Sequence, residues 1–148
     1  MSSLRSDWET PSSLVADLAP YFPWDLDVCA TRPNVCANYY SADALEMEWS
    51  GLCWMNPPYG RQIGKWVAKA ANSKATTVCL VPARTDTRWW QENINAASLV
   101  VFIKGRLYFA IPGKETGPAP FPCAFVVFGE LNQAQINKLS LYGWAVKQ

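Results

Sequence analysis

Four residues in the middle of the chain carry the polar and aromatic groups needed to hold a planar ring with an exocyclic amine. A short apolar run, residues 53–55, ends at Asn56-Pro57-Pro58-Tyr59. Proline fixes φ and donates no backbone hydrogen bond, so Pro57 and Pro58 stiffen the turn and leave carbonyl acceptors. Asn56 adds an amide oxygen, and Tyr59 adds a flat apolar face with a hydroxyl. The segment predicts a corner where an amine donates to Asn56 and to the Pro57 carbonyl while its ring stacks on Tyr59.

The elements after this corner are predicted to fix it in place. Apolar residues at helical spacing predict a helix that packs against a sheet: Ile63, Trp66, Val67 and Ala70. The run Thr76–Val81 predicts a buried parallel strand that ends at Pro82. A second helix is predicted to begin at Thr85 or Asp86. The competing interpretation of the corner is structural, because a proline-stiffened loop after a core strand needs no ligand.

The elements before the corner are predicted to be a helix, a strand and an irregular segment. Thr10 can cap a helix that has Pro11 at its first position and stops at Pro20. The alternating run Trp24–Ala30 predicts a buried strand, and the carboxyl ends of such strands carry function in open α/β sheets. Thr31–Ala42 has no helical periodicity.

The second half of the chain predicts three strands: Leu99–Ile103, Arg106–Ala110 and Phe121–Phe128. The last two are joined by Ile111–Pro120, whose prolines and glycines exclude regular structure and favour a mobile loop over a ligand. A final helix is predicted over Gln133–Leu141, and Trp144–Val146 is predicted to cover an edge of the sheet.

This alternation of strands and helices predicts an α/β fold, a Rossmann-like three-layer αβα arrangement with a mostly parallel sheet. The 148 residues are enough for one domain with a substantial core, and we expect residues 1–148 to form it without a separate target-recognition domain.

The composition excludes several classes of protein. The chain has no histidine and no CxxC pair, so it predicts neither a metal site nor a histidine general base. Its five cysteines are an odd number, and those at positions 53, 79 and 123 lie in apolar runs, as reduced thiols do. No apolar run reaches the ~20 residues of a membrane span and the first residues lack a signal-peptide core, so we expect a cytoplasmic location.

Charge is distributed unevenly along the chain. Residues 1–60 carry two basic and eight acidic side chains, whereas residues 61–114 carry nine basic and two acidic ones. An acidic front suits a cationic ligand and a basic middle suits a phosphate backbone. The candidates for phosphate contact are basic residues where a strand ends or turns: Arg84, Arg88, Lys104 and Arg106. The alternative is that the basic middle is only a solvated surface.

The corner also supports a comparison with a known family. Asn56-Pro57-Pro58-Tyr59 resembles the Asn/Asp-Pro-Pro-Tyr signature of S-adenosylmethionine-dependent amino-methyltransferases, which methylate adenine-N6, cytosine-N4 or glutamine amides. From Trp8 to about Phe128 the chain resembles the compact phage-type DNA adenine methyltransferases. The other matching segments are Trp8-Glu9-Thr10-Pro11, Leu26-Asp27-Val28-Cys29-Ala30, Asp43-Ala44-Leu45, residues 80–87 and Gly105-Arg106-Leu107.

The resemblance implies a site for S-adenosyl-L-methionine. Asp27, with Cys29 and Ala30, resembles the first cofactor motif, in which the acid faces the methionyl ammonium. Thr10 beside Pro11 would lie near the methionine carboxylate. The acid that reads the cofactor's adenine resembles Asp43 in position. The alternatives are structural, since Thr10 and Asp43 can cap helices and a lone aspartate in a strand is often structural.

This sequence departs from the family pattern at one point, because Thr31-Arg32-Pro33-Asn34 replaces the usual glycines. The residue that holds the cofactor ribose is therefore not assigned.

The activity implied by the resemblance is methyl transfer to adenine-N6 in DNA, on a flipped or single-stranded base, by a monomer or homodimer of phage or prophage origin. Asn-Pro-Pro-Tyr sites also act on RNA and on protein glutamine, so these remain alternatives. A catalytically silent nucleic-acid binder is a second alternative, and a structural or interaction protein rich in tryptophan is a third.

Overall fold

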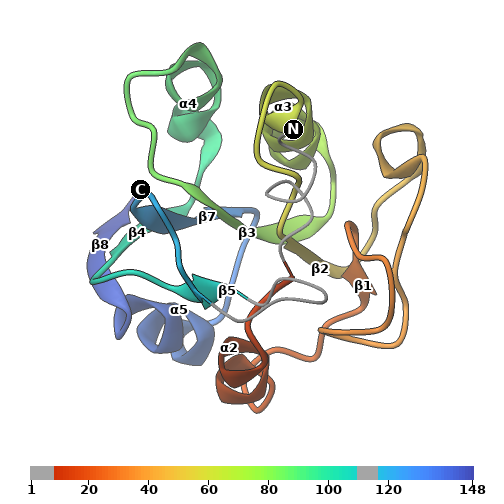
Figure 1. The fold of residues 1–148 in the computed structure, drawn as a ribbon, viewed down its shortest axis with the longest axis horizontal. Helices are drawn as coiled ribbons and strands as arrows, with labels where there is room; N and C mark the ends of the chain where they lie inside the picture. Colours follow the sequence, from red (N-terminus) through yellow and green to blue (C-terminus); the bar gives the residue numbers. More distant parts are fainter. Residues whose placement is uncertain (1–8, 110–116) are drawn as a thin grey trace.

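The computed structural model describes residues 9–109 and 117–148, which form a six-stranded sheet with helices on both faces (Figure 1). In spatial order the strands are β1 (Leu26–Asp27), β2 (Leu52–Met55), β3 (Thr76–Pro82), β7 (Cys123–Phe128), β4 (Leu99–Ile103) and β8 (Gly143–Lys147). A separate two-stranded ladder joins β5 (Tyr108–Phe109) to β6 (Gly117–Pro118). The α-helices are α2 (Ser12–Leu18), α3 (Ile63–Asn72), α4 (Arg88–Asn93) and α5 (Gln133–Ser140), and two 3₁₀ turns are η1 (Ala44–Glu46) and η2 (Ile94–Ala96).

Strand direction differs from the mostly parallel sheet predicted from the sequence. The pairs β1–β2 and β2–β3 are parallel, but β3–β7, β7–β4 and β4–β8 are antiparallel. The end of β4 and the start of β7 lie side by side, because Phe102 near the end of β4 pairs with Ala124 near the start of β7. Two neighbouring strands joined in this way run in opposite directions, so β4 and β7 pair antiparallel. The strands β1, β2, β3 and β4 nevertheless point the same way, so their carboxyl ends lie along the same side of the sheet.

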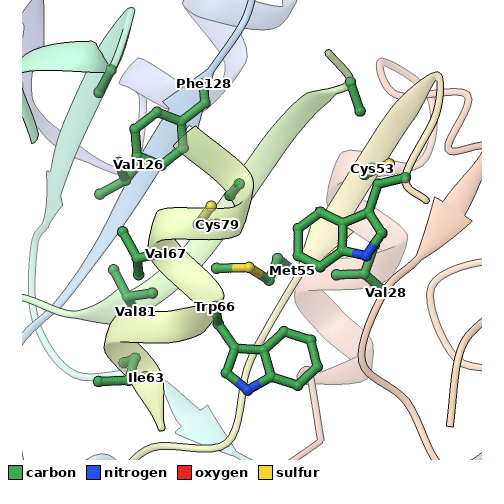
Figure 2. Close-up of a cluster of buried hydrophobic side chains, with 14 of the residues drawn as sticks. Val28, Cys53, Met55, Ile63, Trp66, Val67, Cys79, Val81, Val126 and Phe128 are labelled. Carbon is green, nitrogen blue, oxygen red and sulfur yellow. The ribbon is translucent and has the colours of Figure 1, made fainter. Parts of the chain in front are cut away.

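Two apolar clusters hold the helices against opposite faces of the sheet. One contains Ile63, Trp66 and Val67 of α3 together with Met55 of β2 and Cys79 of β3, and Figure 2 shows these side chains meeting beneath the helix. The other contains residues of α2, α5 and the reverse face of the strands: Leu14, Leu18, Leu139, Trp54, Leu80 and Phe125. Alternate strand residues thus face different helices, as the period-2 geometry of a strand requires.

Several predicted elements are confirmed. The helix after the corner is α3, and all four of its predicted core residues are buried. β3 spans the run that ends at Pro82, β4 has the predicted bounds, and α5 ends one residue early. No helix forms over residues 31–42, and β8 lies at an edge of the sheet as expected for Trp144–Val146.

Other predicted boundaries were wrong. The strand expected over Trp24–Ala30 pairs only through Leu26–Asp27. Helix α4 is capped by Thr87, whose hydroxyl accepts from the Trp90 amide, rather than starting at Thr85 or Asp86. The strand Arg106–Ala110 is β5, whose partner β6 lies within the joining segment that was expected to be irregular.

The mobile-loop prediction for the joining segment falls largely on residues 110–116, which lie outside the described residues. In the described part of the chain, no helix has both the length and the hydrophobicity to cross a membrane.

Candidate active site

A cavity lies where the carboxyl ends of β1 and β2 meet. Asp27 is the last residue of β1, and Asn56 directly follows Met55 at the end of β2, so the parallel pairing brings both to one edge of the sheet. The cavity has a volume of about 390 Å³. It is lined by Glu9 and Thr10, by residues between 27 and 34 and between 40 and 46, by Asn56 and Pro58, and by Trp66 of α3. Ligands bind at this position in open α/β sheets.

The Asn56 side chain is buried and held in one orientation. Its Nδ2 donates to Thr10 Oγ1 at 3.2 Å, and its Oδ1 accepts from the Tyr59 hydroxyl at 3.0 Å. Both partners are hydroxyl groups, and in the assigned orientation Nδ2 lies toward Thr10 and Oδ1 toward Tyr59. Asn56 also lines the cavity, so the amide predicted to accept an amine is held there by two side chains.

Thr10 joins this corner to the N-terminal segment and does not cap α2. Its hydroxyl oxygen also accepts from Trp54 Nε1 at 2.9 Å, and its backbone carbonyl accepts from Asn34 Nδ2 at 3.3 Å. The N-cap position is taken by Pro11, and no side chain caps the helix. The helix-cap interpretation of Thr10 is therefore wrong, because its hydroxyl is committed to Trp54 and Asn56. Its predicted contact with a carboxylate stays a prediction.

Tyr59 is fixed by contacts on its hydroxyl and its ring. The hydroxyl contacts the Leu80 carbonyl at 3.1 Å as well as Asn56. Edge-to-face contacts set the ring 6.1 Å from Phe109 and 5.3 Å from Phe121, between centroids. Burial raises the pKa of the Tyr59 hydroxyl well above its usual value, so the group stays a proton donor. The predicted stacking of a base on this ring remains a prediction.

The two prolines of the corner take different positions. Pro58 lines the cavity, whereas Pro57 is buried and does not line it.

Asp27 is a buried carboxyl group without a cation. It is 1% exposed and accepts from the Cys29 amide at 3.2 Å. Burial raises its pKa to about 7 against the opposing effect of hydrogen bonds from the Cys29 and Val35 backbone. None of the ion pairs among residues 9–109 and 117–148 involves Asp27. The predicted neighbours Cys29 and Ala30 also line the cavity, whereas Pro11 is buried outside it.

Asp43 also lines the cavity, in an unusual backbone conformation. Its φ of 56° is left-handed, the only such value among the described residues other than glycine. It precedes η1, but its side chain makes no capping hydrogen bond. The helix-cap alternative is therefore not observed. A strained non-glycine residue at a cavity wall is typical of a binding position.

The basic residues predicted to contact DNA lie outside the cavity. Arg84 follows the end of β3 and its guanidinium is 5.4 Å from the Phe121 ring centroid. Lys104 follows the end of β4, and Arg106 Nη1 donates to the Ala119 carbonyl at 3.3 Å. Arg88, the first residue of α4, pairs with Glu92 at 3.1 Å.

The matches to known proteins agree with this geometry. A family model described as DNA N-6-adenine-methyltransferase (Dam) matches residues 1–142, nearly the whole chain. The chain belongs to this family. A DNA N-6-adenine-methyltransferase of Escherichia phage T1 is 30% identical over 122 residues, covering 76% of this chain and 51% of the relative. The enzyme of the same name from Haemophilus phage HP1 is 28% identical over 133 residues, covering 82% of this chain and 77% of the relative. The chain thus spans about half the length of the phage T1 protein.

In this member of the DNA N-6-adenine-methyltransferase family, several residues that line the cavity were given no role from the sequence, among them Glu9, Arg32, Asn34 and Tyr40. Arg32 makes a two-point ion pair with Glu9, with Nε to Oε2 at 2.7 Å and Nη2 to Oε1 at 2.8 Å. Residues 31–34 are the segment that departs from the family's glycine pattern, and that departure was the available signal. The pairing itself spans 23 residues and has no local sequence mark.

Proposed function

We propose that this chain is an S-adenosyl-L-methionine-dependent methyltransferase that methylates N6 of adenine in DNA. The observation that carries the proposal is the Asn56 amide, which is held between Thr10 and Tyr59 and lines the same cavity as the buried acid Asp27. We further propose that the sheet with helices on both faces is a Rossmann-like three-layer methyltransferase fold, formed as a single domain over residues 1–148. Family membership over residues 1–142 supports both.

The residues of the cavity fit the cofactor. A cavity of about 390 Å³ lies within the range of small-molecule sites. The Asp27 carboxyl is costly to ionise where it lies, and a methionyl ammonium would compensate that cost. Asp43, which also lines the cavity, would accept from the cofactor's adenine. When bound, S-adenosyl-L-methionine supplies a methyl group activated by its sulfonium.

The protein's part in the reaction is alignment. Asn56 Oδ1 and the Pro57 carbonyl would accept the two N–H groups of the adenine amine, which directs the nitrogen lone pair toward the methyl donor. Fixing two reactants in this way is worth up to ~7–11 kcal/mol in favourable cases. A neutral amide accepts these hydrogen bonds without burying a charge, and the Thr10 and Tyr59 hydroxyls that orient it are also neutral.

The target adenine must leave the duplex or arrive single-stranded, because its amine is paired inside DNA. Extrusion costs a few kcal/mol, which stacking on Tyr59 would offset by ~1–3 kcal/mol. Phosphate contacts are assigned to Arg84, Arg88, Lys104 and Arg106. Three of these follow strands whose carboxyl ends share the edge of the sheet with Asn56.

The test is methyl transfer to defined polymers. Purified protein and labelled S-adenosyl-L-methionine are incubated with duplex DNA, single-stranded DNA, RNA and protein, with the Asn56→Ala variant as control. We expect label in DNA adenine, and resistance of DNA from expressing cells to methylation-sensitive nucleases. Label in RNA or glutamine instead would contradict the proposed substrate. Absence of cofactor binding by calorimetry would indicate a silent nucleic-acid binder.

A further inference from the structure

We propose that Arg32 binds the carboxylate of the cofactor's methionine end, with Glu9 as the residue that positions its guanidinium. This inference rests on the proposed function, because it assigns one more contact within the same cavity. It concerns two side chains joined by an ion pair at the cavity wall.

The charge of the cavity wall identifies Arg32. Four acidic residues line the cavity: Glu9, Asp27, Asp43 and Glu46. Among the described lining residues, Arg32 is the only base. The methionine end of the cofactor is a zwitterion, with one ammonium and one carboxylate. Asp27 suits the ammonium, and the carboxylate needs the one cation that this wall provides.

The geometry leaves Arg32 able to bind a ligand carboxylate while it keeps its ion pair with Glu9. A guanidinium has five N–H donors in a fixed plane. Glu9 takes Nε and one hydrogen of Nη2, and Nη1 has no partner among the described residues. The Glu9 side chain is 14% exposed and that of Arg32 69%, so the carboxylate is the anchored member of the pair and the guanidinium the accessible one. A ligand carboxylate can therefore approach the outer edge of a guanidinium that is already oriented.

The loop that carries Arg32 is tied to the segment that precedes α2. Glu9 directly precedes Thr10, and Asn34 Nδ2 donates to the Thr10 carbonyl at 3.3 Å. Residues 31–34 are thus tied to the N-terminal segment at two points, Glu9–Arg32 and Thr10–Asn34. Asp27 ends the strand that leads into this loop, and Asp27 and Arg32 line the same cavity.

The experiment compares two ligands that differ only in the carboxylate. Calorimetry measures Kd for S-adenosylhomocysteine and for its decarboxylated analogue, in which the carboxylate is replaced by hydrogen. Arg32→Ala should weaken binding of S-adenosylhomocysteine roughly ten-fold or more, as expected for a charged hydrogen bond, and should change the analogue's Kd less than about two-fold. The parent protein should bind the analogue about as weakly as Arg32→Ala binds S-adenosylhomocysteine.

Two further variants keep the test decisive. Arg32→Lys keeps the charge and should recover part of the affinity for S-adenosylhomocysteine. Glu9→Gln should weaken it by less than Arg32→Ala, since the guanidinium remains but is less firmly oriented. Arg61→Ala is the matched control, because Arg61 is exposed and does not line the cavity, and it should change neither Kd.

The outcomes separate this inference from the proposed function. Equal losses for both ligands in Arg32→Ala and Arg32→Lys would mean that Arg32 only supports the loop, and unchanged affinity would remove it from the site. Either result overturns the inference while leaving cofactor binding by the parent intact. If the parent protein binds neither ligand, the cofactor assignment fails and the role of Arg32 fails with it.

Discussion

The side chains of Thr10 and Asn56 are joined by a 3.2 Å hydrogen bond across 46 residues of sequence. Both side chains are buried, and Thr10 accepts from Trp54 as well. The segment that precedes α2 therefore orients the amide at the end of β2, so the predicted cofactor residue and the predicted catalytic residue form one unit.

Replacing Thr10 by valine should lower the free energy of unfolding. Thr10→Val keeps the shape of the side chain but leaves Trp54 Nε1 and Asn56 Nδ2 without this acceptor. An unsatisfied buried donor costs ~1–3 kcal/mol, so we expect a loss of about 2–4 kcal/mol in the free energy of unfolding, measured with urea. Thr10→Ser keeps the acceptor and should stay within about 1 kcal/mol of the parent. Similar stability of the valine and serine variants would show that the two hydrogen bonds contribute little.

Asn56→Ala should weaken the reaction more than it weakens cofactor binding. Its oxygen is assigned to the adenine amine and not to S-adenosyl-L-methionine, so kcat should fall at least a hundred-fold, on the order of the loss of one preorganised polar group. The cofactor Kd from calorimetry should change only a few-fold. Pro57→Ala should shift the two quantities in the same sense. Equal losses in kcat and in cofactor affinity for Asn56→Ala would contradict this division of roles.

Tyr59→Phe separates the hydroxyl of this residue from its ring. The variant keeps the contacts with Phe109 and Phe121 but removes the donor to Asn56 Oδ1 and to the Leu80 carbonyl. We expect a roughly ten-fold lower kcat, because the amide loses one of its two orienting partners, with little change in KM for DNA. A large rise in KM with unchanged kcat would instead assign the hydroxyl to substrate binding.

The parts of the fold that the sequence predicted are those with a strong local pattern. α3 carries four apolar residues at helical spacing over ten residues, and β3 is a continuous apolar run. Strand direction has no such pattern, because β7 is buried on both faces and a fully buried strand has the same composition in parallel and antiparallel pairing. Only two residues of the predicted strand Trp24–Ala30 form β1, although Val28 beyond it is still buried.

In the candidate site, too, the features with a local sequence pattern were predicted and the others were not. Thr10, Asp27, Asp43 and Asn56 were each identified by local motif, and the structure brings all four to one cavity. The hydrogen bonds that orient them depend on side chains far apart in sequence, as in Glu9 with Arg32. Such contacts arise from tertiary packing, so the position of a residue was predictable whereas its partners were not.

Asp27 predicts a pH dependence of stability and of cofactor binding. Its pKa is raised from 3.8 to about 7, so between these values the folded protein holds a proton that the unfolded chain has lost. Stability should therefore fall as pH rises from about 4 to about 7, by on the order of 4 kcal/mol, and this contribution should stay constant above pH 7. Asp27→Asn should lose this dependence in urea unfolding at pH 5 and pH 8.

The same variant tests the ammonium contact. Asp27→Asn removes the charge that would meet the ammonium, so the cofactor Kd at pH 8 should rise roughly ten-fold or more. In the parent protein, the Kd should rise as pH falls below 7, because the carboxyl must ionise to bind. Unchanged affinity in a folded Asp27→Asn variant would remove Asp27 from the cofactor site.

The basic residues that we expect to reach DNA follow strands that end on the same side of the sheet as Asn56. β3 and β4 end on this side and Arg84 and Lys104 follow them, whereas Lys74 precedes β3 on the opposite side. Lys74 is exposed and belongs to the same basic stretch of sequence, which makes it a matched control. Arg88 is partly neutralised by Glu92, with both side chains largely exposed.

Salt dependence of DNA binding distinguishes phosphate contact from general surface charge. Each phosphate neutralised on duplex DNA contributes a slope of about −0.9 in log affinity against log salt. Arg106→Ala and Arg88→Ala should each reduce the slope by about one unit without changing the cofactor Kd, whereas Lys74→Ala should leave the slope unchanged. Because Arg106 also donates to the Ala119 carbonyl, a lower Tm in Arg106→Ala would indicate a structural share in its role. Equal slopes in the parent and in all three variants would mean that the basic stretch is a solvated surface and that the DNA contacts come from a second subunit or another protein.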